Sequence, residues 1–355
     1  MEIASSAPQT VAPQPPGKWR VVILGCGSSG SVPKLSCTAA QQSSRGGCVC
    51  NAVPLHPLNI RGTPSIILTK VFDTPQTEIY HNGNEIEVES FNLLVDCGKS
   101  FYNSAIKFFP VNKIKFIDAV FFTHFHADAI LGLDDIREVQ RKGTNMNVYA
   151  DKKTMGIIRS VYSYLFPESE EILKIRSNLF VAACTSVLLN DYEPLLVDNL
   201  EITPVPLRHG NVMSLGYSFS EVGSNSQFIY FSDYRCKASN EDGTLTPDDI
   251  RNLSLFFDVE KSKKILEKKP ISVMMLDALH PEYPYISHAS LSESVALVRV
   301  FEEMKIEIGQ VLLTGQSCTM DYFKVNVDLQ KEFPNNKVRM SFDGLRFPLE
   351  GPAPV

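Results

Sequence analysis

The sequence predicts a layered fold of the α/β or α+β class. Apolar runs of strand length alternate with helical patterns along the chain, with some antiparallel meanders among them. The chain has 355 residues, 44% of them hydrophobic, which is ample for a large core. Polar residues recur where the expected strands end: Asp96, His124, His209, Asp233 and His280. Such a recurrence predicts a functional site along the edges of packed sheets.

The expected elements follow from local composition. β-Branched and aromatic runs predict strands, with the loops that follow them, at 19–24, 65–69, 91–98, 119–122, 147–150, 200–210, 214–220, 227–234, 272–280, 310–318 and 338–342. Helical spacing of apolar residues predicts helices at 130–137, near 152–166 and near 291–304.

Composition divides the chain into one domain and two tails. Residues 1–18 are rich in Pro, Ser, Ala and Gln, and we expect a disordered tail there. Residues 19–345 are expected to form the domain, with insertions near 73–90 and 236–270, and residues 346–355 to form a C-terminal tail.

Charge and hydropathy bear on partners and location. The chain has 34 Lys and Arg against 40 Asp and Glu, and its net charge of −6 disfavours a nucleic-acid surface built on bulk charge. No apolar run reaches the roughly 18 residues needed to span a bilayer. The first residues show neither a basic segment nor an apolar one, so we expect a cytoplasmic protein without a membrane partner.

The stretch from Thr123 to Ala129 contains the strongest local signal. His124 and His126 follow a short apolar strand, and Asp128 comes two residues later, where a helical pattern begins. Residues two apart on an extended backbone point to the same side, so one metal ion could take both imidazoles. Imidazole and carboxylate suit Zn, Mn or Fe. The alternative is two loop histidines and a helix-capping Asp128.

This stretch, with the later His209 and Asp233, resembles the metallo-β-lactamase-fold hydrolases. The resemblance covers roughly residues 19–345 and implies a four-layer αββα sandwich, two mixed sheets flanked by helices. It also implies roles for six residues: metal ligation by His124, His126, His209 and Asp233, binding of a second metal by Asp128, and support of the ligands from outside the coordination sphere by Asp96.

Three further stretches, 25–33, 132–137 and 231–234, are similar to one branch of that superfamily. It holds the cyclic-phosphate phosphodiesterases of phosphonate breakdown, with the tRNA 3′-processing nucleases as neighbours. The resemblance places His288 where these phosphodiesterases carry a histidine that reaches the substrate phosphate. His288 would then be an electrostatic stabiliser or a general acid. The alternative is a histidine at the start of a helix.

Two departures from the family pattern concern the second metal. Ala129 and Gly315 stand where the family has metal-binding histidines. Asp128 and the shared Asp233 remain, which are too few ligands for a tightly bound ion. The sequence therefore predicts one complete metal site and one degraded site. Asp128 could instead orient the attacking water or act as a base.

Four cysteines match a second feature of that branch, a structural zinc site. Its ligands would be Cys37, Cys48, Cys50 and Cys318. Four thiolates would make a closed zinc site that fixes an irregular, Pro-rich stretch. The alternative is scattered reduced cysteines, which we expect for the other four.

The sequence as a whole favours a metal-dependent phosphodiesterase that uses Zn or Mn and a metal-bound hydroxide. Its substrate would be a small cyclic phosphate or phosphodiester, and a homodimer is among the expected assemblies. A catalytically impaired binding protein of the same fold is the principal alternative. An RNA nuclease and a thioester hydrolase are further ones, because this fold hosts many chemistries.

Overall fold

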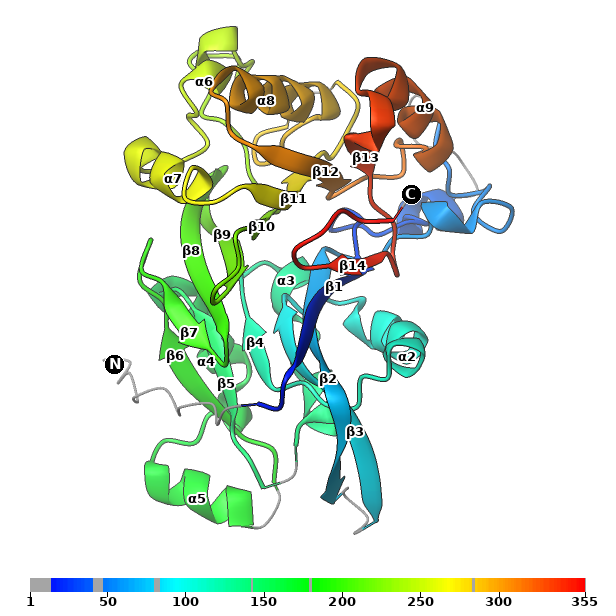
Figure 1. Ribbon diagram of the computed structural model, residues 1–355. Helices are drawn as coiled ribbons and strands as arrows, with labels where there is room; N and C mark the ends of the chain where they lie inside the picture. The colour runs from blue at the N-terminus through cyan, green and yellow to red at the C-terminus, as the bar shows by residue number, and fades with distance from the viewer. Residues whose placement is uncertain are drawn as a thin grey trace. The chain divides into compact units, whose positions relative to one another are not determined.

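The computed structural model describes residues 14–40, 47–79, 84–141, 143–178, 181–282 and 285–354. These residues form two compact units. The first unit comprises Met1–Leu24 and Ser65–Asn190, and the second comprises Gly25–Pro64 and Asp191–Val355. Each unit contains a mixed β-sheet with helices beside it (Figure 1). Part of the expected N-terminal tail, residues 1–13, lies outside the described residues.

The strands of the first unit lie side by side in the order β1-β2-β3-β4-β5-β6. They are β1 (Gly17–Gly25), β2 (Ser65–Ile79), β3 (Glu85–Val95), β4 (Ala119–Phe121), β5 (Met146–Ala150) and β6 (Cys184–Leu188). The pair β2 and β3 is antiparallel, whereas β3, β4, β5 and β6 are parallel neighbours. The β2–β3 pair runs through most of the range expected as the first insertion.

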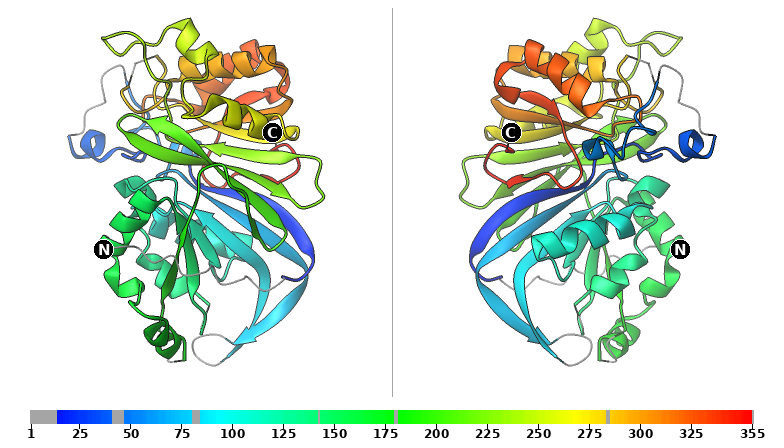
Figure 2. Two further views of the ribbon diagram at one scale, coloured as in Figure 1. Left: turned by 90° about the vertical axis from the view of Figure 1, so that its left-hand side faces the viewer. Right: turned by 90° about the vertical axis from the view of Figure 1, so that its right-hand side faces the viewer.

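Helices accompany this sheet. They are α2 (Phe101–Asn112), α3 (Ala127–Ile130), α4 (Lys152–Val161) and α5 (Glu170–Asn178), with 3₁₀ turns η2 (Asp135–Val139) and η3 (Ser163–Leu165). Helix α2 lies against β2 and β3, as the right-hand view of Figure 2 shows. Phe101 and Phe108 of α2 share a buried cluster with Ile67 and Leu94 of these strands. Because β4 is wholly buried, the loop that follows it is held at a fixed place.

The sheet of the second unit has the order β13-β12-β11-β10-β9-β8-β7. These strands are β7 (Leu195–Val197), β8 (Leu200–His209), β9 (Val212–Glu221), β10 (Gln227–Phe231), β11 (Ile271–Asp277), β12 (Ile308–Thr314) and β13 (Val338–Met340); a short strand β14 (Arg346–Pro348) follows. Strands β7 to β10 are antiparallel neighbours, and β10 to β13 are parallel. The carboxyl ends of β10, β11 and β12 therefore share one edge of the sheet.

The remaining helices belong to the second unit. They are α1 (Leu35–Ala39), α6 (Pro247–Arg251), α7 (Val259–Leu266), α8 (Leu291–Glu303) and α9 (Tyr322–Glu332), with 3₁₀ turns η1 (Pro57–Asn59) and η4 (Pro334–Asn336). Helix α8 begins at a capping box, in which Ser290 and Glu293 each accept a hydrogen bond from the other's backbone N–H. Both α6 and α7 lie in the range expected as the second insertion.

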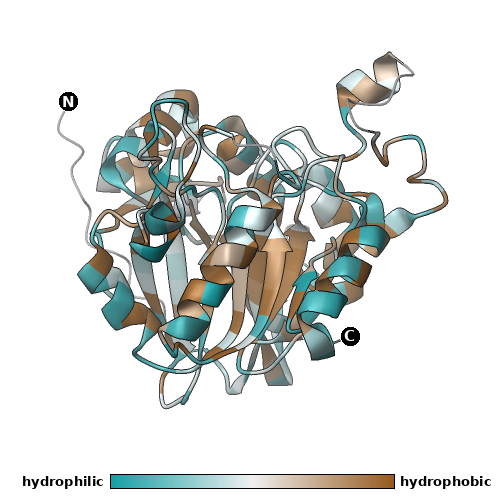
Figure 3. Ribbon diagram, turned by 90° about the horizontal axis from the view of Figure 1, so that it is seen from above, coloured by the Kyte–Doolittle hydropathy of each residue, from teal (hydrophilic) through white to brown (hydrophobic). Residues whose placement is uncertain are grey.

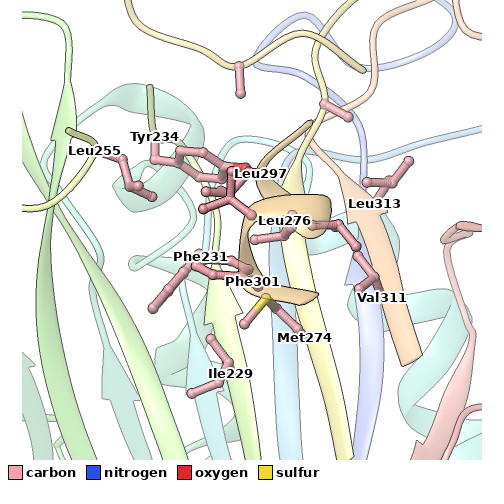
Figure 4. Close-up of a cluster of buried hydrophobic side chains, with 14 of the residues drawn as sticks. Ile229, Phe231, Tyr234, Leu255, Met274, Leu276, Leu297, Phe301, Val311 and Leu313 are labelled. Carbon is pink, nitrogen blue, oxygen red and sulfur yellow. The ribbon is translucent and has the colours of Figure 1, made fainter. Parts of the chain in front are cut away.

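Leu297 and Phe301 of α8 anchor the helix on the sheet. They pack against Phe231, Met274 and Leu313 of the three central strands (Figure 4). Burying each such side chain contributes about 1.5–3 kcal/mol. Figure 3 shows the corresponding pattern, with hydrophobic residues concentrated on strands and hydrophilic residues on the helices. This packing fixes the edge at which the polar residues of the second unit gather.

Candidate metal centres

In the first unit, the histidine motif lies between β4 and α3. His124 is fully buried. His126 is the N-terminal cap of α3, and the backbone carbonyl of His126 accepts hydrogen bonds from the N–H groups of Ala129 and Ile130. The rings of His124 and His126 meet edge to face, with centroids 4.5 Å apart. Asp128 is buried in the first turn of α3. The structure thus brings the two histidines together, as the sequence predicts.

Asp96 fixes the orientation of His124 through Thr123. The Thr123 N–H donates to Asp96 Oδ1 at 2.9 Å, and its hydroxyl donates to Asp96 Oδ2 at 2.7 Å. The same hydroxyl oxygen lies 2.9 Å from Nδ1 of His124. A hydroxyl has a single proton, so towards His124 it acts as the acceptor. His124 therefore carries its proton on Nδ1, which makes Nε2 the nitrogen with a lone pair for a metal.

Two backbone contacts hold α3 beside the Asp96 loop. The N–H of Cys97 donates to the carbonyl of Ala129, and the N–H of Gly132 donates to the carbonyl of Cys97, both at 2.7 Å. A β-carbon on Gly132 would lie 2.7 Å from the carbonyl oxygen of Gly98, so only glycine permits this approach. Ala129 is buried in the same turn, at the place of the expected family histidine.

In the second unit, His209 ends β8 and Asp233 follows β10. The Nδ1 atom of His209 lies 2.7 Å from the carbonyl oxygen of Ser287. A carbonyl only accepts, so Nδ1 carries the proton and Nε2 has the lone pair. His209 is thus fixed in the same tautomer as His124.

Asp233 is buried and has a left-handed backbone, with φ of 50°. Burial raises the pKa of its carboxyl, and the nearby His288 and His209 oppose that rise. Nδ1 of His288 lies 3.4 Å from Asp233 Oδ1 and 2.7 Å from Asp277 Oδ2. His288 therefore faces two buried carboxylates.

Asp277, the last residue of β11, is a site residue that sequence reasoning missed. The available signal was the one that identified Asp96 and Asp233, a polar residue at the end of a buried strand. His280 was singled out at this position instead. Nδ1 of His280 lies 2.8 Å from the hydroxyl of Ser317, and burial lowers its pKa. The same nitrogen lies 3.2 Å from the hydroxyl of Thr319.

Gly315, at the end of β12, has a left-handed backbone with φ of 71°. A β-carbon at this position would overlap Oδ1 of Asp277. Any side chain on residue 315 would therefore displace the Asp277 carboxylate.

The four cysteines that the sequence singles out lie together in the second unit. The sulfur atoms of Cys37, Cys48, Cys50 and Cys318 all lie within 4.8 Å of one another. The N–H of Lys34 donates to the sulfur of Cys50 at 3.2 Å. Burial raises the pKa of the Cys50 thiol to about 12. Four soft donors at this spacing fit a tetrahedral zinc ion, which would stabilise the thiolates that burial disfavours.

Arg61 holds the segment around Cys318 beside the other three cysteines. Its side chain is almost fully buried and donates to the carbonyls of Ser317 at 3.0 Å and Met320 at 2.7 Å, on either side of Cys318. The N–H of Val49 also donates to the carbonyl of Cys318 at 3.0 Å. These contacts bring together segments more than 250 residues apart in sequence.

Comparison with known proteins identifies a domain and a fold. Residues 91–252 match the family model described as the beta-lactamase superfamily domain. An octanoyltransferase from Porphyromonas gingivalis is 27% identical over 205 residues, which are 57% of this chain and 33% of that protein. A ribonuclease Z from Methanococcus maripaludis is 24% identical over 219 residues, 61% of this chain and 63% of that protein. The chain thus spans less than two thirds of either curated relative.

Solved structures match nearly the whole chain. A diphosphatase from the PhnP family has a TM-score of 0.60 at 22% identity, covering 93% of this chain and 96% of that one. The metallo-β-lactamase fold protein YhfI from Bacillus subtilis has a TM-score of 0.55 at 13% identity, covering 94% and 99%. Human tRNase Z, short form, has a TM-score of 0.52 at 12% identity, covering 95% and 100%.

These likenesses show that the chain has the metallo-β-lactamase fold, and the match to the beta-lactamase superfamily domain extends over residues 91–252. The fold class and the superfamily predicted from the sequence are confirmed, and the similar structures include the predicted branch and its nuclease neighbours. The prediction, based on net charge, that nucleic acid is not a partner is not supported, because a ribonuclease Z is among the relatives. No helix in the part of the chain that the structure describes has the length and apolar character needed to cross a bilayer.

Proposed function

Since the chain has the metallo-β-lactamase fold, we propose that it is a metal-dependent hydrolase of small cyclic phosphates or phosphodiesters. The proposed metal ligands are His124, His126, His209 and Asp233. The observation that carries this proposal is the shared tautomer of His124 and His209. Each ring has its Nδ1 proton engaged by a fixed oxygen, which leaves Nε2 as the coordinating nitrogen.

Zn or Mn fits this set of three imidazoles and one carboxylate. When bound, such an ion lowers the pKa of a water to about 7 and polarises a phosphoryl oxygen. Asp96 and Thr123 hold the ring of His124 in place, and the carbonyl of Ser287 does the same for His209.

Two further side chains assist in the proposed reaction. Asp128, buried at the start of α3, would accept a proton from the attacking water or orient that water. As an imidazolium, His288 would donate a proton from Nε2 to the departing oxygen, while Asp277 accepts the hydrogen bond from its Nδ1. Asp277 thus acts as a positioning residue for His288.

We further propose that Cys37, Cys48, Cys50 and Cys318 bind a structural zinc ion. The support is their mutual spacing, together with the Arg61 and Lys34 contacts around them. Such an ion would fix the irregular segment that contains the first three cysteines. A homodimer and a cytoplasmic location stay predictions of the sequence, and sedimentation velocity and cell fractionation test them.

Hydrolysis of bis(4-nitrophenyl) phosphate by the Zn- or Mn-loaded protein tests the enzymatic function. The expected result is metal-dependent release of nitrophenol that His124→Ala abolishes. His56→Ala is the matched control, because His56 is an exposed histidine whose ring lies beside Phe323. If the loaded wild-type protein releases no product above the His124→Ala level, the alternative of an impaired binding protein of this fold is favoured.

A nuclease is the second candidate, because of the relative named ribonuclease Z. It predicts cleavage of a tRNA precursor and RNA binding that weakens steeply with salt. Failure to cleave the precursor, combined with cleavage of the aryl phosphodiester, would favour the small substrate. A thioester hydrolase is tested in the same assay series with an acyl-thioester.

A further inference from the structure

Three side chains gather at the carboxyl edge of β10 and β11 in the second unit. Asp233, Asp277 and His288 each offer one ligand atom, and these atoms lie within 4.8 Å of one another. Nδ1 of His288 is 2.7 Å from Asp277 and 3.4 Å from Asp233. Separations of this order are those between neighbouring ligands of one metal ion with bonds of about 2.1 Å.

Asp277 supplies a second, independent observation. Its side chain is fully buried, and only its Oδ2 atom has a hydrogen-bond partner, which is His288. Its Oδ1 atom is buried and lacks a hydrogen-bond partner within the described structure. An ionised carboxylate with an unsatisfied buried oxygen is strongly unfavourable unless a cation lies beside it. The buried Asp233 adds a second negative charge, whereas His288 can supply at most one positive charge.

Gly315 leaves the space that the Asp277 carboxylate occupies. The family resemblance expects a metal-binding histidine at residue 315, but the Asp277 carboxylate takes the space of any side chain there. Asp277 lies opposite Thr314 in the parallel pairing of β11 and β12, so its carboxylate and residue 315 are neighbours. The carboxylate of Asp277 therefore lies where a side chain on residue 315 would be.

We propose that Asp233, Asp277 and His288 bind a second divalent cation, of the Mn²⁺ or Zn²⁺ class. Two carboxylates and one imidazole suit such an ion and leave coordination positions open for water or a phosphoryl oxygen. The cation would replace the proton that Nδ1 of His288 shares with Asp277, and the proton of the neutral ring would then lie on Nε2, which donates to a substrate oxygen. The inference rests on the proposed function, because Asp233 would be shared between the cation proposed there and this second cation.

Equilibrium dialysis of the full chain against Mn²⁺, with the metal counted by mass spectrometry, tests the inference. We expect Asp277→Asn to bind one Mn²⁺ fewer per chain than the wild type, or to bind that ion with an affinity reduced by at least about tenfold. His288→Ala should have the same effect. Asp249→Asn is the matched control, because Asp249 is a buried carboxylate of the same unit that caps α6 instead. Its Mn²⁺ count should equal that of the wild type.

Equal Mn²⁺ counts and affinities in wild type, Asp277→Asn and His288→Ala would overturn the inference. Should Asp277→Asn fail to fold, ¹⁵N-histidine NMR of the wild type with Zn²⁺ decides the matter. Zinc coordination should shift the Nδ1 resonance of His288, and an unchanged resonance at saturating Zn²⁺ would contradict the proposal. The phosphodiester assay tests the proposed function separately. If the wild type is inactive but Asp277→Asn binds one cation fewer, the proposed function is refuted and this inference stands. If the wild type is active but Asp277→Asn binds as many cations as the wild type, this inference is refuted and the proposed function stands.

Discussion

A β-carbon on Gly315 would overlap Oδ1 of Asp277. The two residues belong to neighbouring parallel strands, and the register of β11 and β12 places them together. A glycine at residue 315 is therefore required by its neighbour, in addition to its left-handed backbone.

Gly315→Ala should destabilise the protein and displace the Asp277 carboxylate. The positive φ and the overlap with Oδ1 together should cost about 1–3 kcal/mol in the free energy of unfolding. Gly351→Ala is the control, because a β-carbon there would lie 3.6 Å from the Pro348 ring, an ordinary contact. Urea unfolding of both variants measures the difference. Equal stabilities for the two would show that Asp277 moves aside freely.

Thr123→Val should weaken metal binding at His124 with little change in shape. Valine has no hydroxyl, so Asp96 loses a donor and Nδ1 of His124 loses its acceptor. Loss of such a supporting contact typically costs about 10- to 100-fold in metal affinity. Zinc affinity by competition with a chromophoric chelator measures the effect, and Thr123→Ser should restore most of it.

Thr69→Val separates this effect from the loss of any buried hydroxyl. Thr69 lies in β2 of the same unit, is fully buried, and its hydroxyl has no hydrogen-bond partner among the described atoms. We therefore expect Thr69→Val to leave zinc affinity unchanged and the free energy of unfolding equal or higher. Similar losses of affinity in Thr69→Val and Thr123→Val would refute the role of Thr123.

Cys318→Ser should remove the zinc ion from the cysteine cluster. A structural zinc contributes its binding free energy to folding, so the melting temperature should fall as zinc is lost. Cobalt substitution provides a direct readout, since thiolate-to-cobalt absorption bands should weaken in the variant. Cys236→Ser is the control, because Cys236 is buried in the core of the same unit, outside the cluster. If Cys318→Ser binds as much zinc per chain as the wild type, the cluster is not a four-cysteine site.

The sequence predicts best what is local. His124 and His126 are two residues apart at the end of a buried strand, and that spacing alone indicates a shared ligand. The clustering of Cys318 with Cys37 was predicted from the family resemblance, since no local pattern connects residues so far apart. Asp277 carries the same local signal as Asp96 and Asp233, but its closeness to residue 315 depends on the pairing of β11 with β12, which local sequence does not reveal. The role of Thr123 in orienting His124 likewise depends on Asp96, which follows the neighbouring strand.

Asp343 should make stability depend on pH in a narrow window. Burial raises the pKa of its carboxyl to about 6 from 3.8, although the N–H groups of Gly62 and Cys26 donate to it. The folded state therefore binds the proton more tightly than the unfolded state. The contribution of Asp343 to stability is complete below pH 3.8 and is lost as the pH rises to about 6. A shift of this size corresponds to roughly 3 kcal/mol.

Asp343→Asn removes this titration. The asparagine oxygen can accept from one of the two N–H groups, so the variant loses a hydrogen bond but has no charge to bury. Between pH 4 and 7, the free energy of unfolding of the wild type should decrease relative to that of Asp343→Asn, by up to roughly 3 kcal/mol. Urea unfolding of both proteins across this range measures the difference. Parallel pH profiles would show that the Asp343 carboxyl keeps an ordinary pKa in the folded protein.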